Sequence, residues 1–182
     1  MDTSVDTRRG VIVTAIKNHL LSAVLWFLLN GFVFAWLVTG WKYGSIFLGL
    51  IGVIFYMSGI YSYAYEQPKL DMIIKRRYDY LMPLKIGGAS GLIIFILSGS
   101  HFLLRLINEE ISMYYGMFVR FLNFPFVYFF HGYDGLSYNF GAVIIMSLIP
   151  ILVAYFAYFM SSKGYSLTQV HDRIVYEKKD NK

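Results

Sequence analysis

PKLDMIIKRRYDYLMP, residues 68–83, is the one strongly charged interval in an otherwise apolar chain. Three consecutive cations, Lys75, Arg76 and Arg77, lie in it between two long hydrophobic stretches. Basic residues next to apolar helices tend to stay on the cytoplasmic side of a membrane. This segment, which we call the connector, therefore divides the chain into two hydrophobic halves and predicts how both halves sit in a bilayer.

The rest of the sequence has the composition of a membrane protein. Of the 182 residues, 57% are hydrophobic and 15% are charged, whereas soluble domains carry about 25% charged residues. A chain of this length has too little interior to bury so much apolar surface. Several runs reach the roughly 20 residues that cross a hydrocarbon core. We therefore expect an all-α, polytopic integral membrane protein with one membrane domain.

Apolar runs and their polar, glycine and aromatic ends give the expected segments. We expect four transmembrane helices in two antiparallel hairpins, with short interfacial helices, and spans at about residues 20–38, 45–64, 86–107 and 140–160. Residues 5–19 would lie in the cytoplasmic interface, and this range includes Lys17, Asn18 and His19. Residues 108–138 would form an extracytoplasmic segment, either interfacial or re-entrant, and residues 161–182 a cytoplasmic tail.

The placement of positive charge predicts the orientation. Of the 16 lysines and arginines, only Lys42, Arg105 and Arg120 fall on the side opposite to the connector. The positive-inside rule then places the connector and both termini in the cytoplasm. The expected location is the plasma or inner (cytoplasmic) membrane.

The connector has the residue pattern of a short amphipathic helix. Asp71 is spaced to pair with Lys75, Pro68 suits a first helical turn, and Pro83 ends the segment. One face is apolar, and it carries Leu70, Ile73, Ile74, Tyr78, Leu81 and Met82. We expect this helix to lie flat on the inner leaflet, where its cations attract anionic lipid.

The alternatives for the connector are a docking surface for a cytoplasmic protein, shared with the basic tail, or a loop that only sets the topology. The residues expected to dock a partner or anionic lipid are Lys75, Arg76, Arg77, Arg173, Lys178 and Lys179.

Small residues mark the faces on which helices are expected to pack. They let two backbones approach closely, which favours association where lipid supplies no hydrophobic force. A proline near the middle of the last span predicts a kink. These packing residues are Gly49, Gly52, Gly59, Gly87, Gly91 and Pro150. Because such faces exceed the need of four helices, we expect a homo-oligomer.

The sequence holds little that would support catalysis or ion coupling. It has no cysteine, so thiolate sites and disulfides are excluded. All 11 carboxylates fall outside the expected spans, which disfavours a classical ion-coupled transporter. Histidine pairs with metal-ligand spacing, nucleophile motifs and phosphate-binding loops are absent. We expect no catalytic, cofactor or metal site and no nucleic-acid partner.

One polar group lies near the outer end of the third expected span. His101 and Arg105 are four residues apart and share a helix face. With Glu109 and His131 they would form a gate or an outer-side site. The alternative is interfacial, with Arg105 extended to the headgroups and His101 bonded to a neighbouring helix.

These observations favour a non-enzymatic, oligomeric membrane subunit. Such a sensor, anchor or scaffold would couple the state of the membrane or envelope to a cytoplasmic partner through the basic surfaces. The alternative is a small oligomeric channel or facilitator, with a pore lined by the small-residue helix faces.

Overall fold

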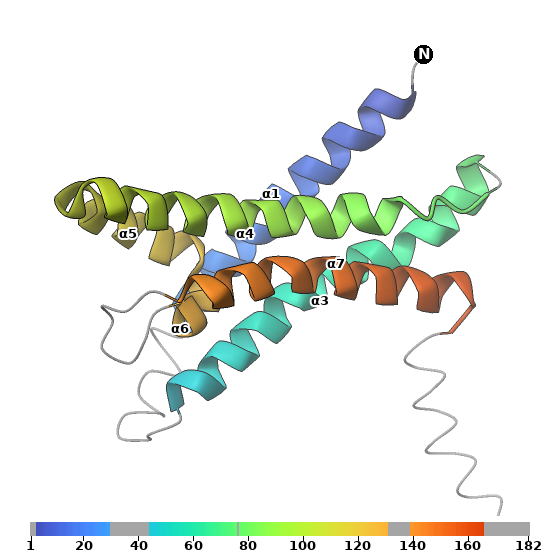
Figure 1. Ribbon diagram of the computed structural model, residues 1–182. Coiled ribbons are helices and arrows are strands. Elements are labelled where there is room, and N and C mark those ends of the chain that lie inside the picture. Colours follow the sequence, from blue (N-terminus) through green and yellow to red (C-terminus); the bar gives the residue numbers. More distant parts are fainter. Residues whose placement is uncertain (1–2, 30–43, 76, 131–138, 166–182) are drawn as a thin grey trace, which may run out of the picture.

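The computed structural model describes residues 3–29, 44–75, 77–130 and 139–165, and every regular element in these ranges is helical. The elements (Figure 1) are α1 (Thr3–Leu29), α3 (Gly44–Lys75), α4 (Met82–Ile107), α5 (Glu109–Leu122), the short 3-10 helix η2 (Phe124–Phe126), α6 (Val127–Phe130) and α7 (Phe140–Ser162). The all-helical class expected from the sequence is confirmed for this part of the chain.

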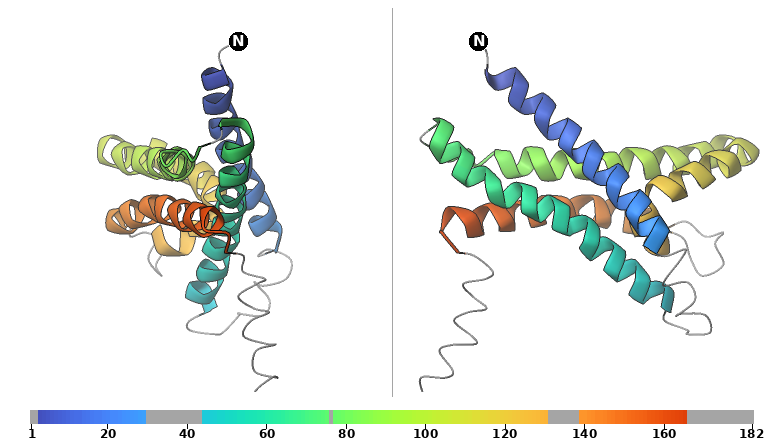
Figure 2. Two further views of the ribbon diagram at one scale, coloured as in Figure 1. Left: turned by 90° about the vertical axis from the view of Figure 1, so that its right-hand side faces the viewer. Right: turned by 180° about the vertical axis from the view of Figure 1, so that it is seen from behind.

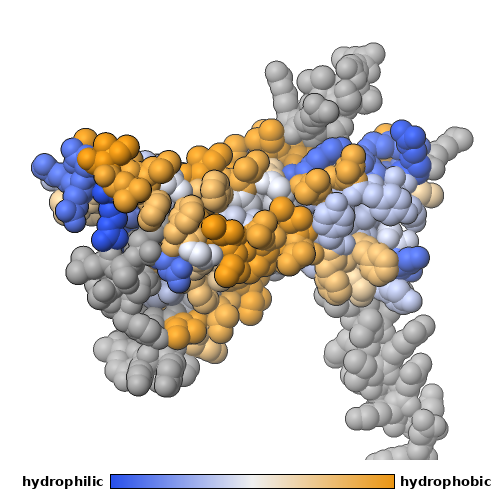
Figure 3. Space-filling model, viewed as in Figure 1, coloured by the Kyte–Doolittle hydropathy of each residue, from blue (hydrophilic) through white to orange (hydrophobic). Residues whose placement is uncertain are grey.

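Four helices are long and apolar enough to cross a membrane. Their apolar stretches are Gly10–Leu29, Ile46–Lys75, Met82–Ile107 and Phe140–Ser162. On the molecular surface, apolar residues form a band between two more polar ends (Figure 3). Helices of this length and composition indicate an integral membrane protein, as the composition predicts.

The long helices form two crossed layers (Figure 2). α1 and α3 lie in one layer and slant across α4 and α7 in the other. The most extensive packing joins α7 to α4 and to α3, whereas α1 and α3 touch each other much less. The start of α1, the end of α3, the start of α4 and the end of α7 lie at the same end of the bundle (Figure 1). We call this the connector end.

The first helix differs from the expected interfacial helix over 5–19 followed by a span at 20–38. α1 is a single helix whose apolar stretch begins at Gly10 and ends at Leu29, and residues 30–38 lie outside the described ranges. His19 therefore falls in the middle of that stretch and is buried. The reason is tertiary, because polar side chains of α1 turn inward and meet other helices.

The expected separate helix over 68–83 is also wrong. α3 continues through the buried Pro68 to Lys75, residues 77–81 form a turn, and α4 begins at Met82. An internal proline costs a helix roughly 3 kcal/mol. Contacts of the next turn of α3 with α7, described below, offset that cost.

Residues 109–130, which we call the inserted segment, fold back from the far end of α4 into the bundle. α5 starts at a capped end, where Asn108 Oδ1 accepts a hydrogen bond from Ile111 N–H at 3.0 Å. It then packs along α4, where the hydroxyls of Ser100 and Tyr115 are hydrogen-bonded at 2.8 Å. The chain turns at η2, which lies among α1, α3 and α6.

The tip of the inserted segment reaches the middle of the long helices. Asn123 Nδ2 donates to Ser98 Oγ at 2.8 Å, and the ring of Phe126 lies 4.9 Å from that of Tyr56. At 1.5 Å rise per residue, Ser98 is about 14 Å from the end of α4 and Tyr56 about 18 Å from the start of α3. The tip of the inserted segment is therefore part of the buried interior of the bundle and not a loop on its surface.

The glycines expected at packing faces lie against other parts of the same chain. A Cβ on Gly87 would lie 2.6 Å from the carbonyl oxygen of Pro150, and one on Gly91 would strike the Ser147 carbonyl. The helices α4 and α7 can pack this closely because both positions lack a side chain. Gly49, Gly52 and Gly59 face Phe129, Trp26 and Asn18, respectively.

Candidate functional site

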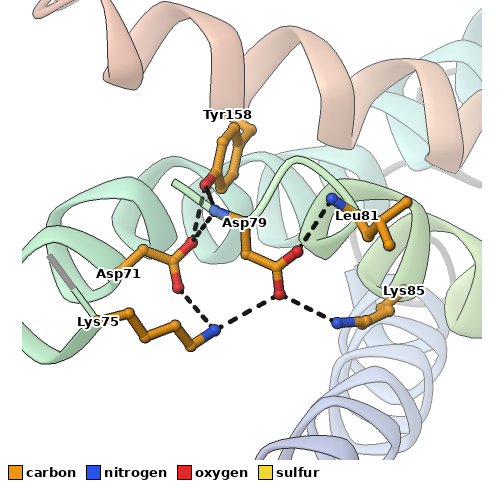
Figure 4. Close-up of polar contacts among 6 residues, drawn as sticks. All are labelled: Asp71, Lys75, Asp79, Leu81, Lys85 and Tyr158. Carbon is orange, nitrogen blue, oxygen red and sulfur yellow. Dashed lines mark hydrogen bonds and ion pairs between the residues drawn. The ribbon is translucent and has the colours of Figure 1, made fainter. Parts of the chain in front are cut away.

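The connector end holds a network of charged and hydroxyl groups, shown in Figure 4. We call it the connector network. Its side chains come from the last turns of α3 (Asp71 and Lys75), the turn after it (Asp79), the first turn of α4 (Lys85) and α7 (Tyr158). It therefore ties three helices together at the place where the sequence has its charged interval.

Asp71 is a buried carboxylate, and both of its oxygens are engaged. Tyr158 Oη donates to Oδ2 at 2.7 Å, and the backbone N–H of Asp79 donates to the same oxygen at 3.2 Å. Lys75 Nζ lies 3.1 Å from Oδ1, so the predicted Asp71–Lys75 pair is confirmed. Because an unpartnered buried polar group is very costly, these contacts stabilise the Asp71 side chain in its buried position.

Asp79 fixes the turn between α3 and α4. Lys85 Nζ lies 3.1 Å and Lys75 Nζ 3.5 Å from its Oδ2, and Leu81 N–H donates to Oδ1 at 3.1 Å. Burial alone raises the pKa of Asp79, but the Lys85 and Leu81 hydrogen bonds and the nearby lysine charges outweigh it and hold this pKa below its usual range. Two carboxylates thus balance two ammonium groups.

Two further tyrosines tie this end of the bundle to the chain at the end of α7. Tyr78 Oη donates to the Ser162 carbonyl at 3.3 Å, and Tyr65 Oη donates to the Tyr165 carbonyl at 2.7 Å. The last carbonyls of a helix lack partners within the helix, so hydroxyl donors stabilise such an end. Tyr65 of α3 and Tyr78 of the turn after it thus join this end of the bundle to the end of α7 and the residues that follow it.

Of the residues predicted to dock a partner, only Lys75 and Arg77 lie within the described ranges. Lys75 pairs with Asp71 and Asp79, and both Lys75 and Arg77 are exposed. Arg76, Arg173, Lys178 and Lys179 lie outside the described residues. An exposed apolar group accompanies Arg77, and we call these residues together the connector surface: Leu70, Ile73, Ile74, Arg77, Tyr80 and Leu81.

The predicted outer-side group is only partly brought together. His101 is buried between α4 and α5, where its ring faces Gly116 and lies 6.4 Å from that of Tyr115. Arg105 of α4 and Arg120 of α5 both lie close enough to act on His101 electrostatically. Glu109 is exposed in the first turn of α5, and His131 lies outside the described residues. Arg120 was not among the predicted site residues.

Sequence reasoning missed a buried polar centre at the tip of the inserted segment. His19 Nδ1 of α1 is hydrogen-bonded to Tyr56 Oη of α3 at 3.2 Å, and the imidazole lies beside Asn123. His19, Asn123 and Ser98 are all buried. The available signal was an ionisable residue inside a long apolar stretch, which marks a candidate site in a membrane protein. The expected interfacial position of residues 5–19 masks this signal.

The connector network can hold the exposed residues of the connector surface in place. The buried centre around His19 can form hydrogen bonds among α1, α3 and the inserted segment. In the described part of the chain, histidines and carboxylates form no cluster of three or more that would hold a metal ion.

Comparison of the chain with protein-family models, curated proteins and solved structures finds no match.

Proposed function

We propose that this protein is a non-enzymatic membrane subunit that docks a cytoplasmic protein on its connector surface. The observation that carries the proposal is the pairing of exposed apolar side chains with a rigidly held, charged turn. Ile73 and Ile74 are 77% and 71% exposed, and Tyr80 and Leu81 on the turn that follows are exposed as well. The hydrogen bonds and ion pairs of the connector network hold this turn between α3, α4 and α7.

The position of the connector surface along the helix axes supports its placement in water, outside the hydrocarbon core. A network of two carboxylates and two lysines belongs at or outside the headgroups, because charged groups are expensive within hydrocarbon. α3 has 32 residues, which gives about 48 Å of helix against a hydrocarbon core of about 30 Å. Ile73 and Ile74 follow Asp71 at the end of this long helix. Apolar side chains exposed to water at that level gain about 1.5–3 kcal/mol each when covered.

The orientation in the proposal follows from the charge asymmetry of the sequence. The connector end faces the cytoplasm of the plasma or inner membrane, with both termini on the same side. Arg77 then provides a cation at the edge of an apolar patch, a composition suited to a protein interface because arginine and aromatic residues are enriched there. Anionic lipid is the competing occupant.

Self-association stays a prediction, and so does the coupling of membrane or envelope state to the partner. The glycine faces that suggested an oligomer are packed against α7, Trp26, Asn18 and Phe129 of the same chain. A second copy would therefore dock on the lipid-facing surfaces of the long helices. For the same reason we do not propose a pore lined by the small-residue faces.

The test is partner retention by variants of the full chain in its native membrane. After mild crosslinking and detergent extraction, the same soluble protein should copurify with the wild type but not with Ile73→Ser/Ile74→Ser or with Arg77→Glu. Ile107→Ser is the matched control, because Ile107 is 81% exposed at the far end of α4. It should retain the partner.

Two results would contradict docking at this surface. One is a wild type that retains no soluble protein, and the other is a partner that all variants retain equally. Binding of the purified wild type to anionic vesicles, lost in Arg77→Glu without any protein partner, would assign the surface to lipid instead.

A further inference from the structure

A line of buried polar side chains runs along the interior of the bundle, independent of the connector surface. Its centre is His19, whose Nδ1 is hydrogen-bonded to Tyr56 Oη at 3.2 Å. On one side of this pair Ser90 lies within hydrogen-bonding reach of Tyr56. On the other side Asn123 lies beside His19 and donates to Ser98. We call this line the polar chain.

The polar chain extends along the helix axes. Ser90 and Ser98 are both buried on α4, and eight residues of helix separate them by about 12 Å. Four different elements contribute to it, namely α1, α3, α4 and the Asn123 junction between α5 and η2. The inserted segment completes it, because Asn123 fills the position between α1 and α4.

Three polar atoms along this line are buried without a hydrogen-bond partner among the described residues. They are Asn18 Nδ2, His19 Nε2 and Asn123 Oδ1. A buried polar group that lacks a partner costs roughly 1–3 kcal/mol. Native proteins rarely leave such groups unsatisfied, and buried water is the usual partner.

The interior has room for water next to one of these atoms. A cavity of about 10 Å³, the space open to the centre of a water molecule, lies among Thr14, Asn18, Gly59, Tyr63 and Ser90. This is close to the volume that holds one water molecule. Most of its lining is apolar and comes from Val11, Ala15, Ile60 and Ile86, and the polar residues that border it are Thr14, Asn18, Tyr63 and Ser90. Water here would connect Asn18 to Ser90 and so to Tyr56.

The chain continues toward both ends of the bundle. Thr14 and the half-buried Tyr63 extend the cavity toward the connector end. Beyond Ser98, the next turn of α4 carries His101, and the exposed Arg105 follows it. Polar side chains therefore lie on both sides of the buried histidine along the helix axes.

We propose that the polar chain conducts protons through the bundle, with His19 as the group that accepts and releases each proton. A water molecule that reaches His19 Nε2 beside Asn123 delivers a proton to this nitrogen. The imidazolium donates its Nδ1 proton to Tyr56 Oη, which passes its own proton to Ser90, and Ser90 passes a proton on to the cavity water. One proton enters and one leaves, and rotation of the hydroxyls together with proton exchange on the imidazole restores the starting state.

The residue types in the polar chain suit proton conduction. Imidazole both accepts and donates a proton, and histidines inside membrane helices are recurrent members of proton relays. The neighbouring described groups on the elements around His19 are the Tyr56 hydroxyl of α3 and the Asn123 amide with the Leu122 backbone of the inserted segment. They are neutral, so no fixed charge there holds the proton in place.

The test uses the purified full chain in vesicles that contain a pH-sensitive dye. A potassium diffusion potential drives protons inward, and the rate of internal acidification is measured. The wild type should acidify the vesicles faster than protein-free vesicles do. His19→Gln, which keeps polar atoms but cannot exchange a proton, should fall to the protein-free rate, and Tyr56→Phe should be strongly slowed.

Tyr114→Phe is the matched control for Tyr56→Phe, because it removes a hydroxyl from an exposed tyrosine of α5. It should conduct like the wild type. Gel filtration and thermal unfolding in detergent verify the fold of each variant. If His19→Gln fails to fold, Tyr56→Phe decides, since it preserves the ring that packs on Phe126.

The proposal is overturned if the wild type acidifies no faster than protein-free vesicles, or if a folded His19→Gln or Tyr56→Phe conducts at the wild-type rate. Partner retention by the connector surface is measured separately in native membranes, so either proposal can fail without the other.

Discussion

At the scale of single residues, Asp71 and Asp79 show how two carboxylates in a row of basic residues acquire different roles. Asp71 lies buried against Tyr158 and anchors the end of α3 to α7. Asp79 is more exposed and joins Lys75 to Lys85 across the turn. The spacing of Asp71 and Lys75 predicts their pair. The partner of Asp71 on α7 lies 87 residues away, and no local pattern reveals it.

The lowered pKa of Asp79 predicts a pH dependence of stability. A carboxylate with a folded-state pKa below its unfolded value stabilises the fold above the unfolded pKa, near 4. This contribution is lost as the pH falls through the folded pKa. Thermal unfolding in detergent between pH 7 and pH 3 should show the wild type losing stability below about pH 4.

Asp79→Asn is the control for this titration, because it keeps an acceptor for Leu81 N–H but cannot ionise. We expect it to be less stable than the wild type at pH 7, with the difference shrinking toward pH 3. Parallel profiles for the two proteins would contradict the assignment to Asp79.

At the scale of elements, the contact of α4 with α7 shows what a pair of glycines four residues apart does here. The glycine positions predict close helix packing, but not which helix is the partner. In the fold, Gly87 lies against Pro150 and Ile151 of α7, whereas a Cβ on the adjacent Gly88 would have no atom within 4 Å. Two neighbouring glycines thus have opposite surroundings.

This contrast provides a matched pair of substitutions. Gly87→Ala should destabilise the protein by about 1–3 kcal/mol or more, because the new methyl group overpacks a backbone contact. Gly88→Ala should be neutral or stabilise α4 by up to about 1 kcal/mol through helix propensity. Unfolding in detergent measures both. Equal effects of the two substitutions would contradict the α4–α7 packing described here.

At the scale of the whole molecule, the inserted segment fills the interior between the long helices. Its irregular turn at η2 is tolerable among membrane helices only because protein surrounds it, since backbone groups exposed to lipid would lack partners. Its amphipathic start and Pro125 predict a short helix followed by a break. How far it enters the bundle depends on the crossing of two helix layers, which leaves space for Phe126 and Asn123 between them.

The topology can be tested directly because the chain has no cysteine. Single cysteines at Arg77, Glu110 and Lys163, all exposed, serve as reporters. A membrane-impermeant maleimide applied to intact cells should label Glu110→Cys and spare Arg77→Cys and Lys163→Cys, as the positive-inside rule predicts. Inverted vesicles should give the reverse pattern. Labelling of Arg77→Cys and Lys163→Cys from opposite sides would mean that the inserted segment crosses the membrane completely.

The sequence by itself determined the membrane class, the number of long apolar helices and the Asp71–Lys75 pair. These features depend on composition or on residues within one or two helical turns, where the helix repeat fixes the geometry. Only the tertiary structure decided that His19 lies deep beside Tyr56, that Tyr158 holds Asp71, and that the connector continues α3 before the chain turns. Such contacts depend on how helices cross and on which polar groups find partners inside the bundle. A buried polar group is stable only with a partner, so its position is settled by the whole assembly and not by its own stretch of sequence.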